Sequence, residues 1–318
     1  MEPKQRVVTL LPSATEIVCA LGFEAQLVGR SHECDFPESV RRLPACTAPK
    51  FDPAGSSAEI DRRVKDVAAR VPSVYAVNAQ VLRDLEPDLI VTQSQCEVCA
   101  VSLEEVERVV GESVGSRPRI LSLSPETLAD IWEDIQRSAD ALGEPRRGFD
   151  LVAALWSRVE DVARITKGFP ERPKVACIEW IEPLMAAGNW MPELIGLAGG
   201  ESVFGAVGGH SPRIEWQALK EKDPEVVMIA PCGFSIPRSL EELDVLTRRP
   251  DWQALKAVRQ GRVYVADGNQ YFNRPGPRIV DSLEMLAEML HPDSFCFGWE
   301  GRGYRRIGTK LGDGAAAP

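Results

Sequence analysis

The sequence lacks several features that mark common classes of protein. No apolar run approaches the roughly 18 residues that a membrane-spanning helix needs. Basic residues number 37 against 47 acidic ones, and the net charge of −10 argues against a nucleic acid as partner. The start, MEPKQRVVTLLPSATEI, lacks the basic, apolar and small-residue regions of a secretory leader. We therefore expect a cytoplasmic protein as sequenced, or a periplasmic or extracytoplasmic one if a leader has been removed.

Motifs for several kinds of catalysis are missing as well. The sequence has no P-loop, no HExxH and no GxGxxG following a strand. An enzyme would need a nucleophile–base pair, paired carboxylates or a phosphate-binding loop, and none of these is evident. We therefore predict a protein that binds a ligand without catalysis of its own.

The composition is that of a soluble globular protein. Of the 318 residues, 44% are hydrophobic and 26% are charged, and the chain is long enough for two domains. Eight cysteines are scattered over a chain too long to be a disulfide-stapled miniprotein. We expect these thiols to be free and the protein to be a monomer.

One long helix is predicted over residues 144–168, where apolar side chains recur every three or four positions. Pro145 suits a first turn, and Gly168 ends the pattern. Short apolar strands alternate with helices on both sides of this segment. By itself the segment fits either a rod that joins two α/β lobes or a surface helix of one larger domain.

In the first half, strands predicted over residues 6–11, 27–30, 88–92 and 119–123 alternate with helices, which favours a parallel sheet. Ligands of such sheets bind beyond the carboxyl ends of the strands. Ser13 is predicted to cap the first helix, with Glu16 completing a capping box. The candidate ligand-binding residues after these strands are Pro12, Ser13, Ala14, Thr15, His32, Glu33 and Gln93.

In the second half, aromatic side chains follow the strands. Strands are predicted over residues 174–179, 223–229 and 262–266, with a helix beginning at Asn189 or Trp190. A polar rim facing an aromatic one would enclose a large, mostly apolar ligand with polar edges. The candidates in this half are Trp180, Trp190, Met191, Phe234, Tyr271 and Phe272.

Six segments together resemble a known family: RVVTLLPSATEIVCALG, LVGRSHECDFP, EPDLIVTQ, GNWMPELIGLAGG, DPEVVMIAPCG and GRVYVADGNQYFNRPGPRI. In this order they resemble the periplasmic binding proteins that carry cobalamin, haem and ferric siderophores, and most of all the cobalamin-binding branch. The resemblance implies an α/β fold in which one long rigid helix joins two lobes, with the ligand cleft between them. The implied domains are an N-terminal lobe (1–124), a lobe helix with the connecting helix (125–172), a C-terminal lobe (173–292) and a partly disordered tail (293–318).

The resemblance also implies roles for residues at matching positions. Pro12, Ser13, Ala14 and Thr15 would lie against the ligand, and Trp190 and Tyr271 would pack on the corrin. The second lobe's edge would be lined by Phe272, Asn273 and Arg274. The implied ligand is cobalamin or a related corrinoid, and the implied partner is the permease of an ABC transporter. The family docks on it through acidic residues, and Asn273 or Glu193 occupies the corresponding place in the second lobe.

Other interpretations remain open at this point. Cys96 and Cys99 have the CxxC spacing of zinc sites, which His32 and Cys34 would complete. Alternatively, His32 or a thiol would ligate the cobalt of a corrinoid, or the thiols would simply be buried. The alternative functions are a haem or ferric-siderophore binder, and a corrinoid-processing or metal-dependent enzyme using the cysteines.

Overall fold

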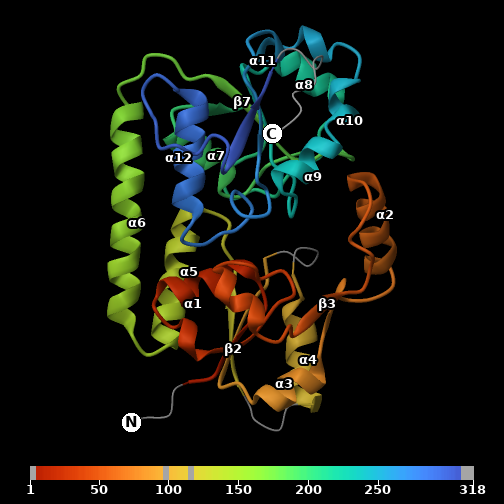
Figure 1. The fold of residues 1–318 in the computed structure, drawn as a ribbon, viewed down its shortest axis with the longest axis vertical. Coiled ribbons are helices and arrows are strands. Elements are labelled where there is room, and N and C mark those ends of the chain that lie inside the picture. Colours follow the sequence, from red (N-terminus) through yellow and green to blue (C-terminus); the bar gives the residue numbers. More distant parts are fainter. Residues whose placement is uncertain (1–4, 96–99, 114–117, 309–318) are drawn as a thin grey trace, which may run out of the picture. The chain divides into compact units, whose positions relative to one another are not determined.

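Two sheets organise the chain, each in its own unit (Figure 1). The computed structural model describes residues 5–95, 100–113 and 118–308. Unit 1 comprises Met1–Arg158 and Arg274–Arg278, and unit 2 comprises Val159–Asn273 and Ile279–Pro318. The chain therefore passes between the units within one helix, α6 (Pro145–Thr166), and again on either side of the five residues Arg274–Arg278. This second passage was not predicted from the sequence.

The sheet of unit 1 is parallel, with the strand order β2-β1-β5-β6. Its strands coincide closely with the predicted ones: β1 (Val7–Thr9), β2 (Leu27–Arg30), β5 (Leu89–Gln93) and β6 (Arg119–Leu123). A separate antiparallel pair is formed by β3 (Thr47–Pro49) and β4 (Tyr75–Val77). Because β1 and β5 are fully buried, their β-branched and leucine residues form the centre of the core.

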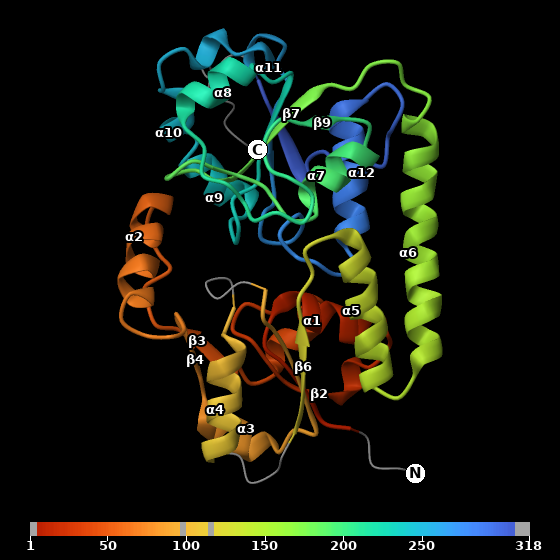
Figure 2. The ribbon, with the colours of Figure 1, turned by 180° about the vertical axis from the view of Figure 1, so that it is seen from behind.

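Helices flank this sheet. The helices α3 (Ala79–Leu85) and α4 (Leu103–Ser113) contribute Leu82, Val106 and Val109 to a core shared with β1 and β5. The helix α5 (Leu128–Ala141) packs against α1 (Pro12–Ala20), and its first turn is fixed by a capping box of Thr127 and Asp130. The helix α2 (Ser57–Ala68) stands apart from the sheet, next to the β3–β4 pair (Figure 2).

The sheet of unit 2 has the order β12-β11-β10-β7-β8, with β9 paired to β7. The strands β7 (Lys174–Trp180), β10 (Val226–Ile229) and β11 (Val263–Ala266) are parallel, as predicted, and β9 (Glu201–Ser202) runs parallel to β7. Two antiparallel strands, β8 (Met185–Ala186) and β12 (Tyr304–Ile307), flank this parallel group. The predicted tail thus contains an edge strand that the sequence analysis missed.

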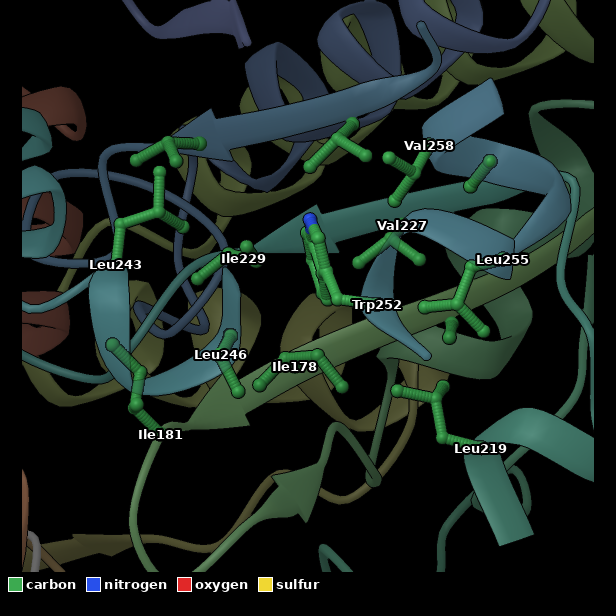
Figure 3. Close-up of a cluster of buried hydrophobic side chains, with 14 of the residues drawn as sticks. Ile178, Ile181, Leu219, Val227, Ile229, Leu243, Leu246, Trp252, Leu255 and Val258 are labelled. Atoms are coloured by element: carbon green, nitrogen blue, oxygen red, sulfur yellow. The ribbon is translucent and has the colours of Figure 1, made fainter. Parts of the chain in front are cut away.

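The core on one side of this sheet surrounds Trp252 (Figure 3). Ile178, Val227 and Ile229 from the strands meet Leu246 and Leu255 from the helical side. The helices of unit 2 are α7 (Met191–Leu197), α8 (Trp216–Lys222), α9 (Ile236–Glu241), α10 (Asp244–Thr247), α11 (Lys256–Arg259) and α12 (Ile279–Leu290). Within the described residues, no helix is both long and apolar enough to span a bilayer.

Candidate functional site

The carboxyl ends of the strands of unit 1 bring three polar loops to one edge of the sheet, as predicted. We call residues 12–15, 31–35 and 93–95 of this edge the polar rim. The Thr15 hydroxyl lies 2.7 Å from the Thr9 hydroxyl and donates to the Cys34 sulfur at 2.9 Å. The loops after β1 and β2 are therefore joined by a buried contact.

The first helix does not begin as the sequence suggested. Leu11 is the N-cap of α1, no side chain caps the helix, and Pro12 occupies its first turn. The prediction of a capping box of Ser13 and Glu16 is therefore wrong. Pro12 has no N–H group, so the first turn of the helix has one donor fewer that needs a cap. Glu16 forms ion pairs with arginines instead.

Glu16 is instead paired with arginines from the segment Arg274–Arg278. Arg278 forms a two-pronged pair with Glu16 (Nε–Oε2 2.8 Å and Nη2–Oε1 2.6 Å). Arg274 Nη1 donates to Glu16 at 3.0 Å and to Asp35 at 2.7 Å. The Arg274 side chain is only 5% exposed and that of Glu16 only 2%. Such charges are stable when buried only because each one is paired.

His32 and Glu33 lie half-buried in the polar rim. The Thr47 hydroxyl lies 2.8 Å from His32 Nδ1 and donates its own proton to Ser31. With the Thr47 proton directed to Ser31, this short contact favours the tautomer that carries its proton on Nδ1, in which Nε2 has the lone pair. Burial, and secondarily the charge of Arg30, lower the pKa of His32, so the ring is neutral.

Glu33 carries a carboxyl group with no hydrogen bond or ion pair to any described residue. Burial raises the pKa of this carboxyl to about 7, although the nearby Arg274 charge opposes the shift. An unpaired, half-buried carboxyl is costly unless something hydrogen-bonds to it.

The other predicted residues of the polar rim are more enclosed. Ala14 and Thr15 are fully buried, and Ser13 and Gln93 are 3% and 4% exposed. Their side chains therefore hold the rim together. The main-chain N–H groups of Ser13 and Ala14 belong to the first turn of α1 and lie at the positive end of the helix dipole.

A zinc site is not supported by the part of the chain that the structure describes. No group of three or more histidine, cysteine or acidic residues there is placed to hold a metal ion. Cys34 is buried and accepts from Thr15, and burial raises the pKa of its thiol to about 12. The two other cysteines of the predicted set, Cys96 and Cys99, lie outside the described residues.

One sequence string has the spacing of a catalytic motif that we did not expect from the sequence. Residues 111–115 read GESVG, the GxSxG pattern of a nucleophile elbow. That elbow lies on a turn from a strand into a helix, whereas residues 111–113 are the last residues of α4. The described residues 111–113 therefore give no support for an elbow, and residues 114 and 115 lie outside the described part of the chain.

In unit 2 the loops after β7, β10 and β11 also meet at one edge. We call residues 180–182, 230–234 and 267–273 the aromatic rim. The Cys232 amide donates to the Glu179 carbonyl at 3.1 Å, and the Asn269 amide donates to the Phe234 carbonyl at 3.1 Å. Gly268 is required here, because a Cβ atom at this position would lie 2.1 Å from the Pro231 carbonyl oxygen.

Two aromatic side chains of this rim are half-buried, Trp180 and Tyr271. The Trp180 ring lies 5.3 Å from that of Phe234, over which Arg238 places its guanidinium at 4.6 Å. Tyr271 meets Trp299 edge-on at 5.6 Å. These two rings are therefore the aromatic surfaces that the rim leaves partly open.

The structure corrects the role predicted for Trp190. Its side chain is only 6% exposed, and its indole N–H donates to the Phe272 carbonyl at 2.8 Å. Met191 and Phe272 are also buried. Trp190 therefore acts as a core residue that supports the loop 271–273, because an indole in a buried place needs a partner for its N–H.

Asn273 and Arg274 were predicted as neighbours along one edge. The structure places them on either side of the boundary between the units. The Asn273 side-chain amide donates to the carbonyls of Ala230 and Gly268, at 3.1 and 3.0 Å. Asn273 thereby fixes the aromatic rim, while Arg274 is held by Glu16 and Asp35.

Comparison with known proteins identifies the family. The Periplasmic binding protein family matches residues 7–269. An uncharacterized ABC transporter substrate-binding lipoprotein of Bacillus subtilis is 22% identical over 92% of this chain and 82% of its own. A vitamin B12-binding protein of Vibrio vulnificus is 22% identical over 90% of both chains.

Solved structures agree with this assignment at the level of the fold. A periplasmic heme-binding protein from Roseiflexus sp. RS-1 superposes with a TM-score of 0.68 at 22% identity, covering 91% of this chain and 99% of its own. The periplasmic vitamin B12-binding protein of Vibrio cholerae gives a TM-score of 0.65 at 20% identity, covering 92% and 98%. Both neighbours are two-lobed α/β proteins. This chain therefore belongs to the periplasmic binding protein family, a family of substrate-binding proteins.

Proposed function

We propose that this protein binds a corrinoid and delivers it to the permease of an ABC transporter, without catalysis. The proposal rests on the character of two rims, one in each unit. Unit 2 leaves the rings of Trp180 and Tyr271 partly exposed. In unit 1 the Glu33 carboxyl and the Nε2 atom of His32 have no hydrogen-bond partner among the described residues. A corrin has an apolar macrocycle with hydrogen-bonding side chains at its edge, and these two rims match those two features. The vitamin B12-binding relatives support the same ligand class.

Burial of the macrocycle on the aromatic rim would supply much of the affinity. Covering about 100 Å² of apolar surface on one ring contributes roughly 2.5 kcal/mol. Trp180→Ala should therefore weaken binding about 30- to 100-fold, as for a central aromatic anchor. Trp216→Ala is the matched control, because Trp216 is also partly exposed and its ring stacks on Trp252, and neither residue belongs to the aromatic rim.

Heme is the second candidate ligand, favoured by one specific observation. The lone pair of His32 Nε2 has no hydrogen-bond partner among the described residues, and neutral imidazole is a common ligand of iron and cobalt. The heme-binding structural neighbours are consistent with it.

Visible absorption spectra distinguish the two ligands. We would titrate the protein with hydroxocobalamin, cyanocobalamin and hemin, and repeat each titration with His32→Ala. Saturable shifts with the corrinoids and none with hemin support the proposal. Saturation by hemin alone, with a spectrum that changes in His32→Ala, would replace the corrinoid by heme. Steady turnover of either corrinoid, in place of saturation, would show an enzyme.

A further inference from the structure

We infer that Trp299 is a positioning residue of the ligand site, which acts by holding the ring of Tyr271 in the aromatic rim. The inference rests on the proposed function, in which Tyr271 offers a partly exposed ring to the ligand. The family match ends at residue 269, so Trp299 lies in the C-terminal segment beyond it. From the sequence, this segment was expected to belong to a partly disordered tail.

The rings of Trp299 and Tyr271 are in direct contact. Their centroids lie 5.6 Å apart and their planes are inclined by 69°, the edge-to-face arrangement that aromatic pairs favour. Both residues are half-buried, so each keeps part of its surface accessible. A half-exposed tyrosine in a loop can adopt several rotamers, and a fixed neighbouring ring limits that choice. Less conformational entropy is then lost when a ligand covers the tyrosine.

Two carboxylates of α12 fix Trp299 itself. The indole N–H donates to Glu284 Oε2 at 3.1 Å, and the main-chain N–H donates to Glu288 Oε2 at 3.0 Å. The other oxygen of Glu288, a residue only 5% exposed, accepts from the Gly298 N–H at 2.5 Å. Hydrogen bonds to a carboxylate are among the stronger ones in proteins. The position of Trp299 is therefore set by a helix of unit 2.

The main chain next to Trp299 is also bonded to the rim loop that carries Tyr271. The Trp299 carbonyl accepts from the Gly303 N–H at 2.9 Å, and the Gly303 carbonyl accepts from the Asp267 N–H at 2.9 Å. The Asp267 carbonyl in turn accepts from the Tyr271 N–H at 3.2 Å. Ring contact and main-chain bonds thus both join Trp299 to Tyr271, and a change at Trp299 should reach the ligand through that tyrosine.

A double-mutant cycle on cyanocobalamin binding, measured by titration calorimetry, tests this role. Trp299→Ala should raise the dissociation constant about three- to tenfold, because the Tyr271 ring loses its support. In Tyr271→Ala, which should itself bind more weakly than the wild type, the same change should alter the constant less than about twofold. The matched control is Phe297→Ala, because Phe297 lies in the same segment, is 43% exposed and stacks on Phe295. This control should bind like the wild type.

Trp299→Phe is a milder variant that serves if Trp299→Ala does not fold. It keeps a ring but cannot donate to Glu284, and should bind about two- to fourfold more weakly than the wild type, again only while Tyr271 is present. Full affinity in the Trp299 variants or in Tyr271→Ala, or an equal loss with and without Tyr271, would overturn the inference and leave the proposed function standing. Absence of cyanocobalamin binding by the wild type would overturn the proposed function, and the inference with it.

Discussion

Replacing Arg274 by methionine tests whether the buried ion network holds unit 1 together. Arg274 donates to Glu16 at 3.0 Å and to Asp35 at 2.7 Å, with its side chain 5% exposed. Removing one member of a buried charge network costs about 3–5 kcal/mol, because charges remain without partners. Here Glu16 keeps Arg278 at 2.6 Å, and Asp35 keeps Arg41 at 3.9 Å. We therefore expect the lower end of that range, about 3 kcal/mol.

Urea unfolding followed by circular dichroism measures this change. The matched control is Arg146→Met, which removes an exposed pair with Asp150 within α6 and should cost about 0.5 kcal/mol or less. A cost below about 1 kcal/mol for Arg274→Met, similar to that of Arg146→Met, would mean that the buried ion network does not hold unit 1 together. Addition of Asp35→Asn should recover part of the loss, because Asp35 loses its contact with Arg274 at 2.7 Å and keeps Arg41 only at 3.9 Å.

Three further predictions concern single sites. Trp190→Phe should lower the free energy of unfolding by about 1–2 kcal/mol, because the Phe272 carbonyl loses its donor; an unchanged urea midpoint would argue against that bond. Gly268→Ala should cost more than about 2 kcal/mol in the same assay, since its Cβ would strike the Pro231 carbonyl, and an unaffected variant would mean that the loop moves freely. Burial raises the pKa of Asp134 from 3.8 to about 6, so the folded state binds more protons between these values and stability falls as the pH rises through them. Between these two pH values, the free energy of unfolding of the wild type should fall by about 3 kcal/mol relative to that of Asp134→Asn. Parallel pH profiles of the two proteins would contradict this expectation.

Local patterns predicted the strands of both sheets well. The runs at β1, β5, β7, β10 and β11 are short and mostly apolar, a pattern typical of strands that are buried on both faces of a parallel sheet. Because parallel strands end at one edge, the sequence also correctly brought the loops of His32 and Glu33 next to the start of α1.

Contacts between residues that are far apart in the chain explain most of the features that were not predicted. Glu16 has the spacing of a capping residue, yet its partner Arg278 is 262 positions away, and no local pattern reveals such a pair. Trp190 stands in a glycine-flanked segment that suggested an open ring, but its indole is buried through a contact with Phe272. The edge strand β12 was missed because its sequence, YRRI, is short and half charged.

Titration calorimetry with cyanocobalamin measures whether this protein binds a corrinoid. We expect one site per chain with a dissociation constant of about 1 µM or lower and a negative heat-capacity change from apolar burial. Trp180→Ala should lose most of this affinity. Absence of binding at millimolar protein and ligand, with the chain shown to be folded, would contradict the claim that this protein is a corrinoid carrier.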